Sequence, residues 1–215
     1  MSKLVVINRT IKSSALVLGV LLLSACISGG PATKYYTLFA DKNIQPLVPG
    51  IPANISLGIG PIVLPDYLEN PSIVTVSDSQ RVIVSGYNVW AGDLKEGVSR
   101  VITDNLSSYY SSSNIWSFPW DVRTRPQYQV RVEFLDLSGV RGKELRLKAK
   151  WSLIDHEADT LLAIGQSSFS EQMGGTSYDA YVAALNQTLH RMSQTLADEV
   201  QQTLMQENAT GILNF

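Results

Sequence analysis

The chain has few of the residues on which many enzymes and metalloproteins depend. It contains one cysteine, Cys26, and two histidines among 215 residues. A single cysteine excludes a disulfide within one chain. The sequence also has no G-x-S-x-G, H-E-x-x-H, G-x-G-x-x-G or Walker A stretch. We therefore expect a protein that is not an enzyme and carries no cofactor.

The sequence also lacks an apolar run of the length that a membrane-spanning helix needs. The run from Ala15 to Leu23 is soon followed by Ser28–Pro31, which breaks a helix, whereas a span requires about 20 apolar residues. Three cations precede the run, and small residues end it. This order is that of a secretory signal. We expect residues 1–25 to be cleaved, and a spanning anchor is the alternative.

Leu23-Ser24-Ala25-Cys26 resembles the bacterial lipobox. The resemblance implies that the Cys26 thiol receives a diacylglycerol and that its new α-amino group is acylated after cleavage. Two or more acyl chains give stable attachment to a membrane lipid surface. In this class an aspartate after the cysteine implies inner-membrane retention, so Ile27 implies the outer membrane.

Charge is scarce and mainly negative in the mature part. The signal holds three of the 17 basic residues and none of the 19 acidic ones, so the net charge changes from −2 to −5 when it is removed. An acidic domain is poorly suited to binding a phosphate backbone, and we expect no nucleic-acid partner.

The rest of the chain is expected to hold one domain. Residues 26–34 form the acylated cysteine and a short tether, residues 35–205 a single α+β domain, and residues 206–215 a loose tail. The eight tether residues after Cys26 span at most roughly 26 Å at ~3.3 Å per residue. The domain should therefore lie close to the membrane surface.

Hydrophobic periodicity predicts the elements of this domain. Apolar residues at spacings of three and four predict a helix from Asp93 to about Ser111 and a second over 178–204. Alternating residues predict a half-buried sheet, and its strands are expected over 35–39, 55–59, 73–76, 81–84, 128–134, 145–153 and 161–169. The fold class is a two-layer α+β sandwich, with a mainly antiparallel or mixed sheet and both amphipathic helices on one face.

One cluster of polar residues could hold a metal ion. Asp155-His156-Glu157-Ala158-Asp159 is the densest group of metal-ligand types, but it also lies where two strands must turn. A hairpin tip is the favoured interpretation, and we assign no metal ligands. His190, beside the apolar stripe of the last helix, is expected at the surface or at the core boundary.

Four stretches carry a family resemblance: Tyr35-Tyr36-Thr37-Leu38; Gly60-Pro61 with Leu64-Pro65-Asp66-Tyr67-Leu68; Trp90-Ala91 with Leu94 and Asp104-Asn105-Leu106; and Val132-Glu133-Phe134 with Gly142-Lys143 and Trp151. In this order and spacing they resemble the PqiC/YmbA family of auxiliary lipoproteins of ABC-type transport and MCE (lipid-shuttling) systems. The resemblance implies an outer-membrane lipoprotein facing the periplasm. Its partner would be an inner-membrane-anchored, PqiB-like MCE protein that moves phospholipid or other hydrophobic molecules.

The resemblance carries over no catalytic residue, only lipidation of Cys26. Four further residues are candidates for partner contact: Asp66, Tyr67, Leu68 and Trp90. Each could instead pack into the core, Trp90 as part of the turn before the helix. Homo-oligomerisation is also compatible with the sequence. Alternative functions are an accessory lipoprotein of outer-membrane barrel or lipopolysaccharide assembly, and a periplasmic hydrolase or metal-binding protein.

Overall fold

The computed structural model describes residues 30–47 and 50–212, with side chains as far as residue 207. The signal, Cys26 and Ile27 lie outside these residues. The chain divides into two units, Met1–Thr33 and Lys34–Phe215. Residues 30–33 of the first unit have no regular structure. The second unit contains every element that follows.

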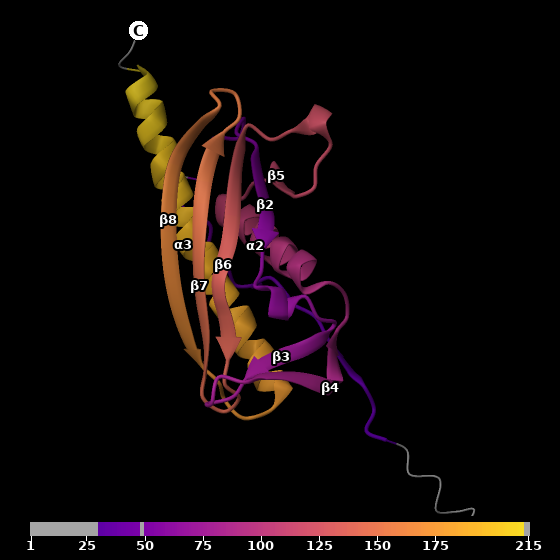
Figure 1. The fold of residues 1–215 in the computed structure, drawn as a ribbon. Helices are drawn as coiled ribbons and strands as arrows, with labels where there is room; N and C mark the ends of the chain where they lie inside the picture. The colour runs from indigo at the N-terminus through magenta and orange to yellow at the C-terminus, as the bar shows by residue number, and fades with distance from the viewer. Residues whose placement is uncertain (1–29, 48–49, 213–215) are drawn as a thin grey trace, which may run out of the picture. The chain divides into compact units, whose positions relative to one another are not determined.

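A five-stranded mixed sheet forms the main layer of the second unit (Figure 1). Its spatial order is β5 (Ile115–Ser117), β2 (Leu57–Val63), β6 (Tyr128–Gly139), β7 (Glu144–Asp155) and β8 (Thr160–Gln172). The last three strands form an antiparallel meander. β2 runs parallel to both of its neighbours, which makes the sheet mixed.

Two helices cover one face of this sheet, as predicted. α2 (Leu94–Tyr110) packs on β2 and β5, α3 (Tyr178–Ile212) packs on β7 and β8, and the two helices contact each other. α2 begins where expected because the Asp93 carboxylate accepts a hydrogen bond from the Glu96 N–H at 3.0 Å. It ends at Ser111, which adopts a left-handed conformation. No helix within residues 30–47 and 50–212 is long and apolar enough to cross a membrane.

The core lies between the helices and the sheet. Alternate residues of β7 point into it, from Leu145 to Leu153, and the residues between them remain exposed or half-exposed. Matching apolar residues of α3, such as Leu185, Leu189 and Leu196, are almost completely buried. The α+β fold class is therefore confirmed, and the open face of the large sheet is the one opposite the helices.

A second, three-stranded sheet has the order β1 (Lys34–Tyr36), β4 (Val82–Trp90) and β3 (Ser72–Val76). β3 and β4, which correspond to the strands expected over 73–76 and 81–84, pair as an antiparallel hairpin. β1 runs parallel to β4 but pairs only with its last three residues, 88–90. β1 stops at Tyr36, earlier than expected, and Leu38 then turns into the core. Two short 3-10 helices, η1 (Asp66–Leu68) and η2 (Val122–Thr124), complete the elements.

The end of the chain differs from the prediction. α3 continues to Ile212, beyond the expected end at Leu204, so residues 206–212 are helical and not a loose tail. No proline or glycine interrupts the chain between Leu204 and Asn208, and Gln, Met and Glu there favour a helix. Leu204 is buried, so packing also supports the extension.

Candidate docking surfaces

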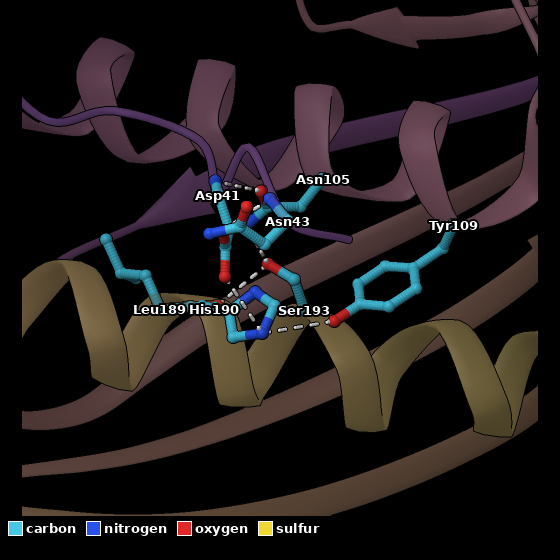
Figure 2. A network of polar contacts seen from close by, with 7 residues as sticks. All are labelled: Asp41, Asn43, Asn105, Tyr109, Leu189, His190 and Ser193. Carbon is cyan, nitrogen blue, oxygen red and sulfur yellow. Dashed lines mark hydrogen bonds and ion pairs between the residues drawn. The ribbon is translucent and has the colours of Figure 1, made fainter. Parts of the chain in front are cut away.

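A polar network fastens the segment after β1 to both helices (Figure 2). The Asp41 N–H donates to Asn105 Oδ1 of α2 at 3.0 Å, and Asn105 Nδ2 donates to Ser193 Oγ of α3 at 3.2 Å. Asn105 and Ser193 are completely buried. The network therefore joins three segments that are far apart in the sequence.

His190 lies at the edge of the same network. Its Nε2 is 3.4 Å from Asp41 Oδ2 and 3.5 Å from the Tyr109 hydroxyl. Burial, followed by the nearby Asp41 carboxylate, raises the pKa of Tyr109 to about 12. Ser193 donates its only hydroxyl proton to the Leu189 carbonyl at 2.8 Å. The arrangement holds the segment in place, and it does not present the serine as a nucleophile.

The structure separates the four predicted partner-contact residues into two groups. Leu68 and Trp90 are only 3% and 7% exposed, so they pack in the core, as the alternative interpretation of the sequence allowed. Tyr67 is half-buried and donates its hydroxyl to the Leu137 carbonyl at 3.2 Å, whereas Asp66 is exposed. Only Asp66 and part of Tyr67 remain available for contact.

Two surface hollows lie on either side of the turn before α2. One, of about 530 Å³, is lined by Trp90, Arg100 and Phe118, and the other, of about 440 Å³, by Leu68, Glu69 and Lys95. Both also contact Asp93, the residue that caps α2. Leu68 and Trp90 therefore line the walls of these hollows and do not project from the surface.

A larger groove, of about 650 Å³, runs over the open face of the five-stranded sheet. Strand register places Ser152 of β7 between Arg131 of β6 and Ile164 of β8. Exposed apolar side chains from two strands, Val63 and Ile164 among them, line this open-sheet groove. Apolar side chains gathered in one concavity mark a binding surface.

The charge of the open-sheet groove differs from that of the whole domain. Arg125, Arg131 and Lys150 line it, against two carboxylates, Glu133 and Asp159. The mature chain has an expected net charge of −5, so cations are concentrated here. The groove can accept an apolar segment that carries negative charge.

His156 also lines this groove. The Arg125 guanidinium donates to His156 Nδ1, which is therefore the unprotonated ring nitrogen. Burial, followed by the charges of Arg125 and Arg131, lowers the pKa of His156 below its ordinary value of 6.5. The ring is thus held neutral beside two cations.

The Asp155–Asp159 stretch forms the turn between β7 and β8. The Asp155 carboxylate is buried and accepts hydrogen bonds from the Glu157 and Ala158 N–H groups at 2.7 and 3.1 Å. These bonds define a hairpin tip. Across the described part of the chain, no three or more His, Cys, Asp or Glu residues are grouped so that they could hold a metal ion.

Sequence reasoning missed the open-sheet groove. One signal could have indicated it, because residues 161–164 of β8 are apolar at four successive positions and so on both faces of the strand. Val63, at the end of β2, likewise lies in a short run of successive apolar residues. The cations from the loop before β6 and from β6 and β7 gave no signal, since only the strand pairing brings them together.

These features define the chain as a two-layer α+β protein with a groove on the open face of its large sheet. The family model described as the ABC-type transport auxiliary lipoprotein component matches residues 36–197, most of the chain. The chain therefore belongs to this family, which confirms the resemblance to PqiC/YmbA proteins. Membership makes it a membrane-anchored lipoprotein of the periplasmic type.

Solved structures support the fold. Protein XCC0632 from Xanthomonas campestris, which carries the DUF330 family model, is similar with a TM-score of 0.69 and 13% identity, over 82% of this chain and 99% of its own. The crystal structure of an uncharacterized protein has a TM-score of 0.64 and 20% identity, over 79% and 99% of the two chains. No curated protein sequence gives a significant match.

Proposed function

We propose that this protein is the outer-membrane-anchored docking component of an MCE-type intermembrane lipid transport system. The family match over residues 36–197 carries the proposal, because it assigns the chain to an auxiliary lipoprotein of ABC-type transport. An auxiliary component supplies attachment and contact. We assign it no catalysis and no cofactor.

The open-sheet groove is the surface that fits this role best. It combines exposed apolar side chains with three cations, and so it can take an apolar segment of the partner that carries carboxylates. The partner in this proposal is the periplasmic part of a PqiB-like MCE protein. Cargo lipid would then pass through the partner, while this chain holds the partner at the outer membrane.

The proposal is tested by pull-down and titration of the mature protein with the periplasmic part of a PqiB-like MCE protein from the same organism. Ile164→Asp replaces a side chain that is 58% exposed in the groove. We expect it to weaken binding by about tenfold or more, the effect of losing one interface anchor of about 1.4 kcal/mol. Lack of association by the unaltered protein would overturn the proposed function.

The matched control is Val122→Asp, because Val122 is an exposed apolar residue that does not line the groove. It should leave binding unchanged. Asp66→Ala provides a second comparison at the other candidate surface. If binding is lost with Asp66→Ala but retained with Ile164→Asp, the partner contacts η1 and not the groove.

A further inference from the structure

The β3–β4 hairpin carries an apolar surface that the fold leaves uncovered. Val82, Ile83, Val84 and Tyr87 of β4 are between 38% and 52% exposed, and Tyr35 of the adjacent β1 is 72% exposed. Three of these residues are consecutive, so half-exposed apolar side chains lie on both faces of the strand, and within residues 82–87 only Ser85 is buried. We refer to residues 82–87 of β4 as the bare section.

One edge of the bare section is also open. β3 pairs with β4 on one side through Val82, Ile83 and Val84, whereas β1 reaches only residues 88–90 on the other. Within the part of the chain that the structure describes, no strand pairs with that second edge alongside residues 82–87. Apolar side chains next to an unpaired strand edge form a surface that usually contacts a membrane or another protein.

The start of β1 links this surface to the expected lipid anchor. Lys34 pairs with Asn88, and the bare section extends six residues back from Asn88 to Val82, about 20 Å at ~3.3 Å per residue. Cys26 precedes Lys34 by eight residues, at most roughly 26 Å of chain. The membrane that holds an acylated Cys26 therefore lies within about 26 Å of the strand beside the bare section.

The chemistry of the surface suits a lipid headgroup region. Tyrosine combines an apolar ring with a polar hydroxyl and is enriched at membrane interfaces, and Tyr35 and Tyr87 are both exposed here. Lys34 and Arg81 are exposed at the two ends of the surface. The nearby Asp78 carboxylate is paired with Lys143 Nζ at 2.7 Å. The remaining cations favour anionic lipid.

We propose that the bare section, together with Tyr35, lies against the lipid surface that holds the acylated Cys26. The contact is shallow, because the unpaired backbone groups of β4 need water or headgroups as hydrogen-bond partners. It adds a second attachment beside the acyl chains and so restricts rotation of the domain about its tether. The inference rests on the lipid anchor and not on the transport role.

The test uses the full acylated protein in vesicles of phosphatidylethanolamine and phosphatidylglycerol. Lipid occupies the sulfur of the chain's single cysteine, so Val84→Cys supplies one free thiol for an environment-sensitive fluorophore. Ile164→Cys is the matched control, since Ile164 is a similarly exposed β-branched residue on the large sheet. A nitroxide lipid in the same vesicles reports contact by quenching the fluorophore.

We expect at least twofold stronger quenching at position 84 than at position 164, and an increase with the phosphatidylglycerol content. Equal quenching at both positions, with the protein bound to the vesicles, would overturn the proposal. Protection of position 84 from aqueous iodide without lipid quenching would also overturn it, since another protein surface would then cover β4. Tyr87→Cys replaces Val84→Cys if thermal melting shows that the latter is unfolded.

Vesicle flotation tests the lipid anchor on which this inference rests. Protein that does not float with the vesicles refutes the anchor and the inference together. The MCE partner is absent from the vesicles, so failure of the transport proposal leaves the quenching result unaffected.

Discussion

His156 is held neutral by its neighbours in the open-sheet groove. Burial lowers the pKa of the imidazole, and the Arg125 guanidinium lowers it further. Well above pH 6.5 the imidazole is mostly neutral in both the folded and the unfolded chain. As the pH falls below 6.5, the unfolded chain takes up a proton that the folded chain does not, so stability falls.

Arg125→Met should therefore raise the pKa of His156. The proton NMR titration of the imidazole measures this directly, and the chain has only two histidines to assign. Arg81→Met, on the β3–β4 hairpin, is the control and should leave the titration unchanged. A His156 pKa that stays the same in Arg125→Met would show that the guanidinium does not act on the ring. His156→Gln should make the free energy of unfolding fall less steeply as the pH drops below 6.5.

Gly165 of β8 leaves room for the indole ring of Trp151, its cross-strand neighbour on β7. A Cβ atom at this position would lie 2.4 Å from the Trp151 indole ring. Gly165→Ala should lower the free energy of unfolding by about 1–3 kcal/mol, because a buried indole cannot move aside without strain. Urea denaturation gives the value. Gly174→Ala is the control, since its added methyl group meets no atom within 4 Å, and its effect should stay within about 0.5 kcal/mol.

At the scale of elements, the pairing of α2 with α3 depends on buried polar contacts as well as apolar ones. Asn105 bonds the Asp41 N–H on one side and Ser193 on the other. Asn105→Ala leaves both groups without their partner, and we expect a loss of about 1–3 kcal/mol. Amide hydrogen exchange should accelerate at Asp41 more than in β6 or β7.

Asn186→Ala serves as the matched change on α3. Asn186 accepts a hydrogen bond from the Phe39 N–H at 3.2 Å, but that contact is exposed to solvent. Its loss should cost about 0.5 kcal/mol or less. Equal effects of the two substitutions on unfolding would show that burial of the Asn105 contacts is not what stabilises the helix pair.

Elements with strong local signals could be predicted from the sequence. The regular alternation of β7 and the Asp93 cap of α2 each occur within a few residues. β5 could not be predicted, because a strand of three residues has no measurable period. The parallel pairing of β2 with β5 and β6 was also out of reach, since the partners are joined only across long connections.

At the scale of the whole molecule, the expected lipid attachment depends on one side chain, Cys26. Cys26→Ser should release the protein from the outer membrane or mis-sort it, because the acyl chains have no other attachment point in the lipobox resemblance. Membrane fractionation measures the outcome, with the unaltered protein as reference. Unchanged outer-membrane fractionation of Cys26→Ser would contradict the lipid anchor.

Ile27→Asp tests which membrane is involved. The lipidated protein should then be retained in the inner membrane and remain acylated. Retention of Ile27→Asp in the outer membrane would separate the anchor from the sorting expectation.

The candidate surfaces were less accessible to sequence reasoning than the anchor. A lipobox is recognised from four consecutive residues, whereas the open-sheet groove needs residues from four separate strands and their connecting loops. Trp90 illustrates the difficulty, because an aromatic residue before a helix has the same local sequence whether it faces a partner or the core. Only the tertiary structure shows that the Trp90 ring is covered.

The junction between β1 and β4 determines how the domain bears tension. The two strands are parallel over Lys34–Tyr36, so a pull along the axis of β1 shears all their cross-strand hydrogen bonds together. Beyond β1, force passes into α2 through the Arg100 bond to the Leu38 carbonyl at 2.9 Å and the Asn105 network. A load on the tether is thus shared by strand and helices before it reaches the five-stranded sheet.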